Sequence, residues 1–501
     1  MPTRIARASV ASGLVAVAAC SGPAAAGGPG PPGGECVIAP PLHAEAAVSP
    51  DAAPRPVVVG LPGPVDPSHA PVPRTPAERL LFAQLYETLV RLDCGGRPEP
   101  ALAASWSVDD GGRTWTFTLR ADARDWEGDA VTATDVGSSW TRAQETPARP
   151  GAARPSRAFV SLAVLGPRTL RAELPRPVAA GFFARPELAV RTREVEGGWP
   201  VGSGPFRPAP RASGTSGAPL RSTTLAGPVP LEMRVVAGDP RDALDQGVDL
   251  LVTSDPAVID YATAGAAFRA VPLPWSRTWL VALGAGVAAP ATGTPAGAPP
   301  AVSWAPRAAL AALARDAVRA DARPAEEPTE PPACVPPDAR FPPVAPEAAR
   351  AARVVYRLGD PVARSLAERI VALALDARRA DAAWLADAAP GLAGARPVRA
   401  AGLATGDFER ALRAGGDAAY VVSVDTGRDP CGTLEAAVAV APWLLGPAPA
   451  GVVGGRQPTL LPLIETRGTL LVHQGVGGVS VDGRGVLRLE HVHGARAEPS
   501  R

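Results

Sequence analysis

The stretch that decides the fold is "LYETLVRLDCGGRPEPALAASWSVDDGGRTWTFTLRADARDWEGDAVTATDVGSSWTRA", which runs from Leu85 to Ala143. Within it, Trp115, Phe117 and Leu119 alternate with threonines, and this period of two predicts a strand with one apolar face. The Asp-Asp-Gly-Gly run before the strand supplies residues typical of a turn. We therefore expect a hairpin, and we assign its large aromatic side chains to a core and not to a ligand.

The flanking sequence predicts alternating strands and helices. Three valines before Gly60 predict a buried strand, and apolar residues at helical spacing predict a helix from about Pro76. Asp135 is expected to cap a further helix. In the second half, "ARVVYRLGD" predicts a strand and "PVARSLAERIVALALDARRA" a helix. A strand followed by a helix is the signature of an α/β domain.

The N-terminus predicts export and lipid attachment. Residues 1–20 carry early arginines, a short apolar run and the sequence "LVAVAACSG", so Cys20 is the expected lipidation residue of a lipoprotein signal peptide. The alternative is an ordinary secretion signal with a chance cysteine. Residues 21–56 are nearly all Ala, Gly and Pro, and such a composition buries too little apolar surface to fold. We expect this segment to be a disordered tether.

Charge and cysteine usage limit the class of protein. The formal net charge of +1 gives no electrostatic case for binding nucleic acid or an anionic membrane surface. Beyond Cys20, four cysteines in an exported chain allow two disulfides in three connectivities. Distance along the chain favours Cys36 with Cys94 and Cys334 with Cys431, and free buried thiols are the alternative.

A second biased region covers about residues 286–348. Pro-rich segments there flank one alanine-rich helix, expected over about residues 306–319. We expect the Pro-rich segments to be mobile surface loops.

The order of motifs resembles a known family, the solute-binding proteins of ABC importers that capture peptides, nickel and related solutes (family 5). The quoted stretch holds Tyr-Glu-x-Leu, Pro-x-Leu-Ala-x-Ser-Trp, an Asp-Gly hairpin with Phe-x-Leu-Arg, Trp-x-x-Gly and Thr-Ala-x-Asp-Val in the family's order. "VGSGPF", from Val201 to Phe206, is similar to the family's Gly-Pro-aromatic turn, and "ALDQGVDLL", from Ala243 to Leu251, to its Gly-x-x-Asp strand. We expect the glycines of "VGSGPF" to shape a turn.

The resemblance implies a two-lobed α/β fold of the periplasmic-binding-protein type (class II, cluster C), with an extra domain inserted in the first lobe and closure by a hinge. Residues 271–454 would form lobe II, which includes the Pro-rich loops, and residues 76–194 would form the inserted domain. Lobe I would be built from three segments, residues 57–75, 195–270 and 455–501.

The resemblance also suggests ligand residues. Peptide-binding relatives hold the ligand's amino group on an aspartate that precedes an Asp-Pro or Glu-Pro dipeptide, and "YVVSVDTGRDPCG" offers Asp425 in that place. Ser423 and Val424 would lie on the strand before it, whose backbone could bind an extended peptide. The spacing is one residue longer than in the family, and the usual tryptophan is absent. Asp425 as a solvated turn residue is the alternative.

Three tryptophans and two histidines complete the candidates. Trp275, Trp279 and Trp443 fall where the resemblance places lobe-crossing or cleft-lining segments, and packing in the core is the alternative for each. His491 and His493 share one face of a terminal strand and allow a nickel hypothesis. No third ligand stands near them in the sequence.

The sequence predicts a binding protein and not an enzyme, because no nucleophile elbow, zinc-protease motif or phosphate loop stands out. We expect a lipid-anchored, extracytoplasmic monomer that delivers an oligopeptide-like solute to an ABC permease, without a cofactor. One alternative is a degenerate relative that acts as an envelope receptor or scaffold. Another is a receptor for nickel or a metallophore.

Overall fold

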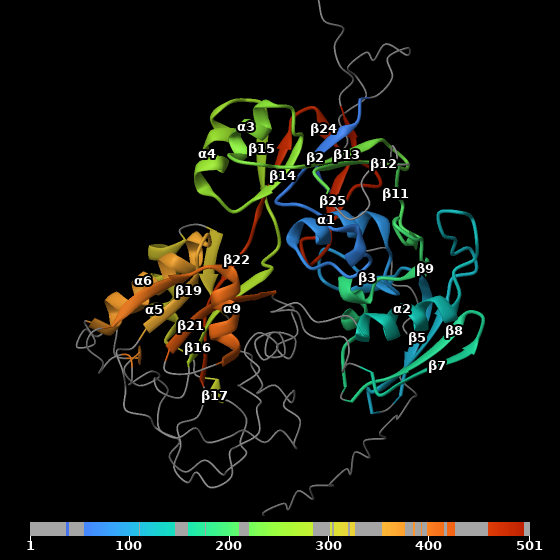
Figure 1. Cartoon of the computed structure of the whole chain (residues 1–501), viewed down its shortest axis with the longest axis horizontal. Coiled ribbons are helices and arrows are strands. Elements are labelled where there is room, and N and C mark those ends of the chain that lie inside the picture. The colour runs from blue at the N-terminus through green and yellow to red at the C-terminus, as the bar shows by residue number, and fades with distance from the viewer. Residues whose placement is uncertain are drawn as a thin grey trace, which may run out of the picture.

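The computed structural model has the predicted two-lobed α/β architecture (Figure 1). Lobe I and the inserted domain form one side of the molecule, and lobe II forms the other. The structure describes residues 37–39, 55–109, 111–145, 159–175, 177–209, 220–283, 301–302, 305–318, 321–325, 353–375, 384–385, 392, 398–414, 418–425 and 459–494.

Lobe I is built on a mixed sheet in the order β11-β12-β13-β2-β14-β23-β15. The central strand β2 pairs in parallel with β13 and β14, and β23 runs antiparallel to β14 and β15. The strands are β2 (Val57–Leu61), β11 (Arg207–Pro208), β12 (Ser222–Ala226), β13 (Leu231–Val235), β14 (Leu250–Thr253), β15 (Phe268–Pro272) and β23 (Thr469–His473).

Both faces of this sheet are covered, so β2 is apolar at every position. Val57 and Val59 pack on one face with helix α1 (Pro76–Leu85). Val58 packs on the opposite face with the helices α3 (Pro240–Asp245) and α4 (Pro256–Ala264). A strand with two buried faces has a continuous apolar run, which explains the valines before Gly60.

Helix α1 starts at a complete capping box. Thr75 Oγ1 accepts a hydrogen bond from the Glu78 amide, and Glu78 accepts one from the Thr75 amide. The other end of α1 is packed against the "VGSGPF" turn. The Gly204 amide donates to the carbonyl of Leu85, and a Cβ on Gly204 would lie 2.5 Å from the Leu85 carbonyl carbon. Glycine is needed there for close approach of two backbones.

The inserted domain packs helix α2 (Ala133–Glu145) on the sheet β5-β6-β8-β7. Trp115 and Phe117 lie on the buried face of β6, as the alternation predicts. Thr132, and not Asp135, occupies the N-cap of α2. The Asp135 amide donates to Thr132 Oγ1, and the Asp135 carboxylate accepts from the Thr132 amide. The strands are β5 (Ala103–Val108), β6 (Thr114–Leu119), β7 (Ser161–Gly166) and β8 (Thr169–Glu173).

Lobe II is built on the sheet β17-β22-β16-β21-β19-β20, with β18 also paired to β22. Helices α5 (Arg307–Ala317) and α6 (Pro361–Leu375) share one core cluster, and α9 (Thr405–Ala414) packs in the other. The strands are β16 (Arg277–Leu283), β17 (Ala301–Val302), β18 (Ala322–Pro324), β19 (Arg353–Arg357), β20 (Arg399–Leu403), β21 (Ala418–Asp425) and β22 (Thr459–Thr466). The predicted strand at "ARVVYRLGD" and both predicted helices are confirmed.

Short elements complete the fold. They are β1 (Val37–Ala39), β3 (Val90–Leu92), β4 (Pro98–Pro100), β9 (Arg191–Arg193), β10 (Val201–Gly202), β24 (Val476–Gly477), β25 (Val479–Val481), β26 (Leu487–Arg488), β27 (His493–Gly494) and the 3-10 helices η1 (Pro67–His69), η3 (Ala180–Ala184) and η4 (Pro186–Leu188). No helix in the described part of the chain is both long and apolar enough to cross a membrane.

The tether expected over residues 21–56 is not uniformly unstructured. β1 pairs antiparallel with β25 in a small sheet with β26. Composition misled the prediction, because a strand of three residues needs little apolar surface when a distant strand supplies its backbone partners. The Pro-rich region likewise contributes β17 and β18 to the lobe II sheet.

Three domain boundaries differ from those expected. Helix α1 belongs to the lobe I core, so the inserted domain does not begin at residue 76. Strand β15 extends lobe I to Pro272. Strand β22 belongs to the lobe II sheet, so lobe II extends to Thr466. The physical reason is shared: each element belongs to the sheet that completes its hydrogen bonds and buries its side chains.

Candidate functional site

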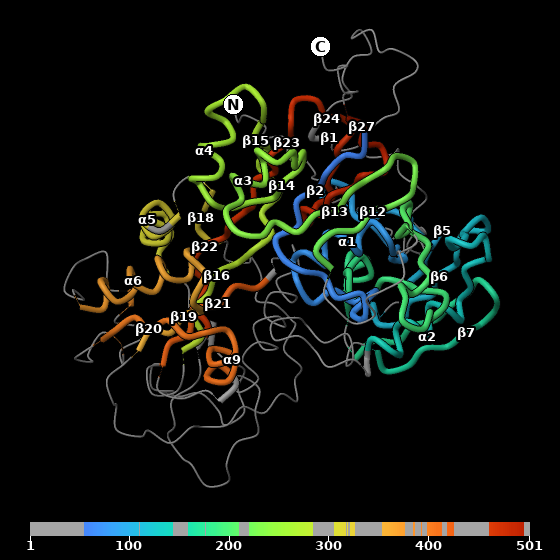
Figure 2. Tube along the Cα trace, turned by 45° about the horizontal axis from the view of Figure 1, so that its top comes forward, coloured from blue at the N-terminus to red at the C-terminus, as the bar shows by residue number. Residues whose placement is uncertain are grey.

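Two chain segments connect the lobes, and they cross side by side (Figure 2). Residues 273–276 join β15 to β16, and residues 467–468 join β22 to β23. Both crossings are paired at their two ends, because Pro272 is opposite Thr469 in lobe I and Arg277 is opposite Thr466 in lobe II. The two short connections run in opposite directions beside each other, and connections of this kind allow one lobe to rotate against the other about a hinge.

The predicted ligand strand ends at this hinge. β21 lies next to β16, and its last residue, Asp425, is opposite Arg277, the first residue after the crossing. Ser423 is half-buried and lies opposite Trp279. Val424 is 2% exposed, and its side chain belongs to a lobe II core cluster, so only its backbone remains for a peptide. The side chain of Asp425 lies outside the described part of the structure.

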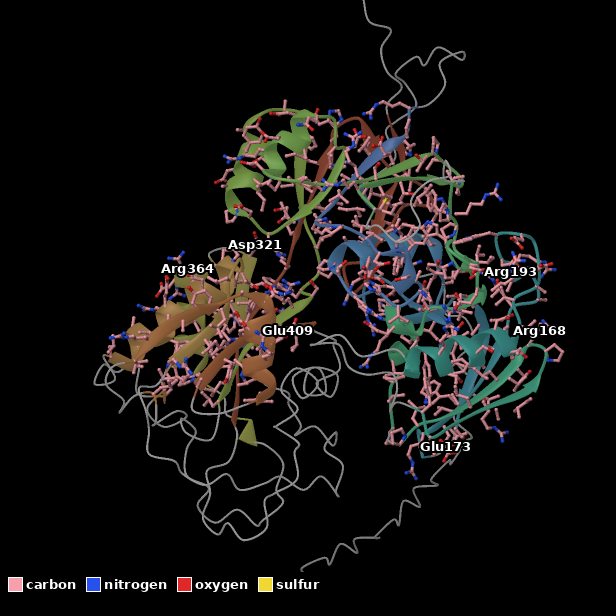
Figure 3. All side chains as sticks on the ribbon, in the orientation of Figure 1. Arg168, Glu173, Arg193, Asp321, Arg364 and Glu409 are labelled. Atoms are coloured by element: carbon pink, nitrogen blue, oxygen red, sulfur yellow. The ribbon has the colours of Figure 1, made fainter. Side chains whose placement is uncertain are left out.

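Trp275 lies in the crossing segment itself, between two guanidinium groups. The central carbons of Arg323 and Arg467 lie 4.9 Å and 4.7 Å from centroids of its ring system. Arg323 donates to Glu465 at 2.8 Å, and Arg467 donates to Asp321 at 3.4 Å. These contacts tie the crossing to lobe II, on the edge where Figure 3 labels Asp321. They account for Trp275 without a solute, and its ligand role stays a prediction.

Trp279 is a core residue of lobe II. It is 2% exposed, and its indole nitrogen donates to Thr466 Oγ1 at 2.9 Å. This bond links β16 to β22 next to the hinge, so packing explains the residue fully. Trp443, the third tryptophan candidate, lies outside the described residues.

The lobe I side of the junction is formed by strand ends. Thr253, the last residue of β14, is opposite Thr469, so the carboxyl ends of the parallel strands β2, β13 and β14 face the crossing. In open α/β sheets, ligands bind outside the carboxyl ends of the strands. The loop after β2 therefore extends from the edge where a solute would enter.

A buried carboxylate fixes the shape of that loop. Glu78 is 1% exposed and accepts hydrogen bonds from the amides of Arg74, Thr75 and Asp66 at 2.5, 3.1 and 3.3 Å. His69 Nδ1 lies 2.8 Å from the same carboxylate. A loop held in this way keeps its backbone groups in place before any ligand arrives. The Thr-x-x-Glu spacing is the sequence signal that could have indicated the capping motif, whereas no local pattern indicates the further partners of Glu78.

Arg484 is a cation beside the hinge that the sequence did not indicate. It lies in the turn between β25 and β26 and donates to the carbonyl of Gly181 at 2.6 Å. A Cβ on the next residue, Gly485, would lie 3.9 Å from Pro274 in the crossing segment. Burial, together with the nearby charge of Arg185, lowers the pKa of Arg484 to about 10.

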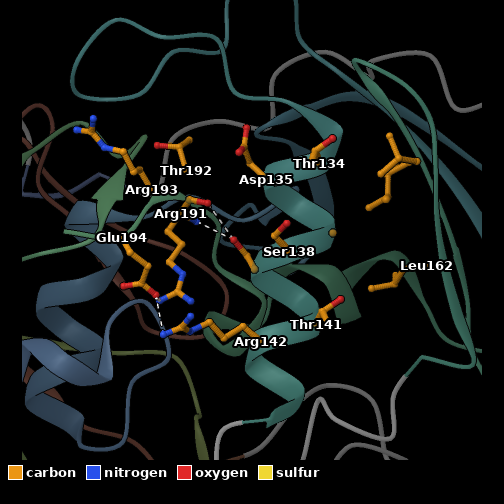
Figure 4. A pocket seen from close by; sticks show the side chains of 14 residues that line it. Thr134, Asp135, Ser138, Thr141, Arg142, Leu162, Arg191, Thr192, Arg193 and Glu194 are labelled. Atoms are coloured by element: carbon orange, nitrogen blue, oxygen red, sulfur yellow. Dashed lines mark hydrogen bonds and ion pairs between the residues drawn. The ribbon is translucent and has the colours of Figure 1, made fainter. Parts of the chain in front are cut away.

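A groove of about 560 Å³ lies elsewhere, on the inserted domain, along α2 and β9 (Figure 4). Arg142 and Arg191 both contact Glu194 there, at 3.0 Å and 2.6 Å. Burial lowers the pKa of Arg191, with the charge of Glu194 acting in the opposite direction. None of the predicted ligand residues lines this groove.

The histidine pair does not lie at the junction. His493 is on β27, which pairs with β24. β24 follows the His473 end of β23, and the crossing is at the other end, at Thr469. His493 Nδ1 is 3.2 Å from the carbonyl oxygen of His491. Within the described residues, no group of three His, Cys, Asp or Glu side chains could hold a metal ion.

Residues 97–212 match a family model described as "Bacterial extracellular solute-binding proteins, family 5 Middle". The dipeptide-binding protein DppE of Bacillus subtilis is 45% identical over 58 residues, which are 12% of this chain and 11% of DppE. The periplasmic oligopeptide-binding protein OppA of Haemophilus influenzae is 40% identical over 78 residues, 16% of this chain and 14% of OppA. The sequence similarity thus spans about an eighth of these relatives.

Solved structures are similar over most of the chain. A dipeptide-binding protein of Pseudoalteromonas sp. SM9913, in complex with Met-Leu, has a TM-score of 0.55 at 14% identity and covers 88% of this chain and 100% of its own. NikA of Brucella suis, in complex with Fe(III)-EDTA, has a TM-score of 0.56 at 16% identity and covers 87% and 99%. These structures confirm the two-lobed fold. These relatives are named as binding proteins.

Proposed function

We propose that the chain is a family 5 solute-binding protein, which captures an oligopeptide-like solute between its lobes outside the cytoplasm and delivers it to an ABC permease. The observation that carries this proposal is the hinge: two paired crossings at 273–276 and 467–468, with the end of β21 beside them. A relative named as a dipeptide-binding protein, with Met-Leu bound, has the same fold.

The solute acts by stabilising the closed form of the protein, in which the lobes have rotated together about the hinge. A ligand shifts a two-state equilibrium only through its different affinities for the open and the closed state. The backbone of β21 at Ser423 and Val424 would bind an extended peptide, and Asp425 would pair with its amino group. An ammonium group stabilises a carboxylate that closure removes from water.

The first experiment measures ligand-induced stability with a library of di- to pentapeptides. By mass action, a peptide present at 100 times its Kd stabilises the folded protein by about 2.7 kcal/mol. Native mass spectrometry of the freshly purified protein would identify any solute already bound. If no peptide raises the melting temperature and no solute co-purifies, peptide capture is ruled out, and the alternative of an envelope receptor or scaffold replaces it.

A charge variant tests the proposed anchor residue. Asp425→Asn should weaken peptide affinity by roughly 10–100-fold, because a charged hydrogen bond to the ligand is lost. Asp407→Asn is the matched control, since Asp407 is an exposed lobe II residue on α9 that pairs with Arg410. Equal affinities for both variants and the wild type would remove Asp425 from the site.

The membrane attachment is a separate proposal. Cys20 would carry the lipid and hold the protein, as a monomer, at the outer face of a membrane. Intact-mass measurement of the exported protein should show a diacylglycerol adduct on the wild type and none on Cys20→Ala. An unmodified Cys20, or cleavage at another position, would make the N-terminus an ordinary secretion signal.

Nickel or a metallophore is the second candidate solute, because relatives include the nickel-binding periplasmic protein of Escherichia coli and NikA. The position of His491 and His493 away from the hinge argues against these histidines as ligands. Titration with nickel alone and with nickel–histidine, on the wild type and on a His491→Ala, His493→Ala variant, would decide. Equal affinity in both proteins would leave a metal complex as solute but would exclude the histidine pair.

A further inference from the structure

We propose that Cys94 forms a disulfide with Cys36, and that this bond clips the N-terminal segment onto lobe I beside the hinge. Cys94 is disulfide-bonded. Its partner is one of Cys20, Cys36, Cys334 and Cys431, all of which lie outside the described residues. The position of strand β1, which begins one residue after Cys36, indicates which of these four cysteines is the partner.

Strand β1 starts near the Val481 end of β25. Val37 is opposite Ser480, and Ala39 is opposite Val479, so the chain runs antiparallel to β25. One step back along the chain from Val37 therefore leads towards Val481 and the turn that follows it. Cross-strand neighbours have Cα atoms about 4.5–5.5 Å apart.

The turn that holds Cys94 lies at the same end of β25. The Gly483 amide donates to the carbonyl of Asp93 at 2.8 Å. A Cβ on Gly483 would lie 2.7 Å from the Cα of Gly96, so the backbones of the two turns are in direct contact. The start of β1 and the turn that holds Cys94 thus lie at the same end of β25, and a disulfide between Cys36 and Cys94 needs the two chains to come close together there.

The other cysteines are attached to different parts of the molecule. Cys334 lies between β18 and β19, and Cys431 lies between β21 and β22, and all four strands belong to the lobe II sheet. Cys20 is the proposed lipid acceptor. Cys36 alone is adjacent in sequence to a described residue that is paired with β25.

Bond formation needs an oxidant, which we identify as an envelope thiol–disulfide oxidoreductase in its disulfide form. One Cys thiolate attacks the enzyme's disulfide and forms a mixed disulfide. The second thiolate then displaces the enzyme sulfur, so the protein gains one S–S bond while the enzyme leaves as a dithiol. Two electrons and two protons pass from the protein to the enzyme.

The clip gives the N-terminal segment two fixed points on lobe I. The second is Arg55, whose guanidinium donates to both carboxylate oxygens of Asp249 at 2.7 Å and 2.8 Å. Asp249 is 2% exposed and also accepts from the Val58 amide, so this contact is part of the lobe I core. The free part of the tether would end at residue 36 and not at residue 56.

The disulfide does not depend on the proposed function, but its consequence does. If the chain closes on a solute, the lobe attached to the N-terminal segment is lobe I, and lobe II moves relative to it. The clip also fixes the hairpin β25–β26, which carries Arg484 and Gly485 next to the crossing segment.

Peptide mapping of the full exported chain tests the bond directly. A protease that cuts after glutamate, used without reductant, separates the cysteines, because Glu35 directly precedes Cys36 and Glu87 lies before Cys94. The expected product links the fragment that begins at Cys36 to the fragment that begins at Thr88 and dissociates on reduction. Cys94 linked to Cys20, Cys334 or Cys431, or recovered as an alkylated thiol, would overturn the proposal.

Hydrogen exchange tests the clip. Cys36→Ser should raise the exchange rate of the β25 amides, Val479–Val481, and should lower the melting temperature by about 5 °C. Cys431→Ser, which leaves the proposed pair intact, is the control and should leave exchange in β25 unchanged, whatever its effect on the melting temperature of lobe II. Wild-type protein with reductant should reproduce the Cys36→Ser result if that variant fails to fold. Unchanged exchange in β25 after reduction would show that the N-terminal segment is not clamped there.

Discussion

The inserted domain and lobe II are held together by different kinds of core. Six aromatic rings form the centre of the inserted domain, with neighbouring centroids 4.7 to 6.4 Å apart; they belong to Trp115, Phe117, Trp140, Phe159, Phe182 and Phe183. The lobe II core between the sheet and α5 and α6 consists mostly of Val, Leu, Ile and Ala. One region depends on ring geometry, and the other depends on aliphatic packing.

This difference explains where sequence similarity survives. The family model matches residues 97–212, which cover most of the inserted domain and none of lobe II. Aromatic clusters are specific in shape and orientation, so few substitutions fit them. Aliphatic cores accept many exchanges that conserve volume and pattern. Lobe II can therefore keep its fold while its sequence changes.

The largest expected effect is the loss of a central ring. Trp140 is fully buried, stacks on Phe159 at 4.8 Å and donates its indole N–H to the Leu188 carbonyl. Trp140→Ala should lower the free energy of unfolding of the inserted domain by about 4 kcal/mol, measured by urea denaturation. Trp106→Ala is the control: this ring is only partly buried, so its loss should cost about 1 kcal/mol.

An aliphatic truncation in lobe II should cost somewhat less. Leu366 on α6 is fully buried in the core cluster of that lobe. Leu366→Ala should cost about 3 kcal/mol by the same measurement, and Leu366→Met less than about 1.5 kcal/mol. A cost below 0.5 kcal/mol for the alanine variant, on the order of a surface change, would mean that lobe II is loosely packed and would contradict the comparison.

A charge pair at the base of the inserted domain should give a smaller, pH-dependent effect. Burial raises the pKa of Glu87, and Arg120, which donates to its carboxylate at 3.0 and 3.2 Å, opposes this shift. Arg120→Met removes the cation, so the pKa of Glu87 should rise further. When the pKa of a group is higher in the folded than in the unfolded protein, the free energy of unfolding falls as the pH rises from the unfolded-state pKa to the folded-state pKa.

The cost of Arg120→Met should therefore be about 2 kcal/mol at pH 7 and clearly less at pH 4. The double variant Glu87→Gln, Arg120→Met lacks the titrating group and should lose this difference between the two pH values. The same cost at both pH values in the single variant would show that packing of the Arg120 stem, and not charge, is responsible.

The smallest expected effect concerns the hinge. Trp275→Leu removes the contact of the ring with Arg323 and Arg467 and should cost about 1 kcal/mol. The radius of gyration from small-angle X-ray scattering should increase, because the crossing loses its ring contact with Arg323 of lobe II. Trp275→Phe keeps a ring and should show half of this effect or less. No change in either variant would exclude Trp275 as a brace of the crossing.

The sequence indicated local elements well wherever a periodic pattern dominated. The alternation around Phe117 gave the strand β6, and the helical spacing after Pro76 gave α1. The pattern could not assign α1 to a domain, because it indicates that Leu81 and Leu85 are buried but not which domain buries them. For the same reason, the family resemblance placed Trp275 and Trp279 near the crossing, but it could not show that Trp275 contacts two arginines in the crossing while Trp279 packs in the core of lobe II.

What the sequence alone determined is the family resemblance, the two-lobed fold and most helices and strands, because hydrophobic periodicity and turn residues act over short distances along the chain. Only the tertiary structure decided that β1 adds to β25, that two arginines enclose Trp275, and that the carboxylate of Glu78 holds the loop at the junction. These contacts join segments whose partners are chosen by space, hydrogen-bond geometry and burial, and no local pattern encodes that choice.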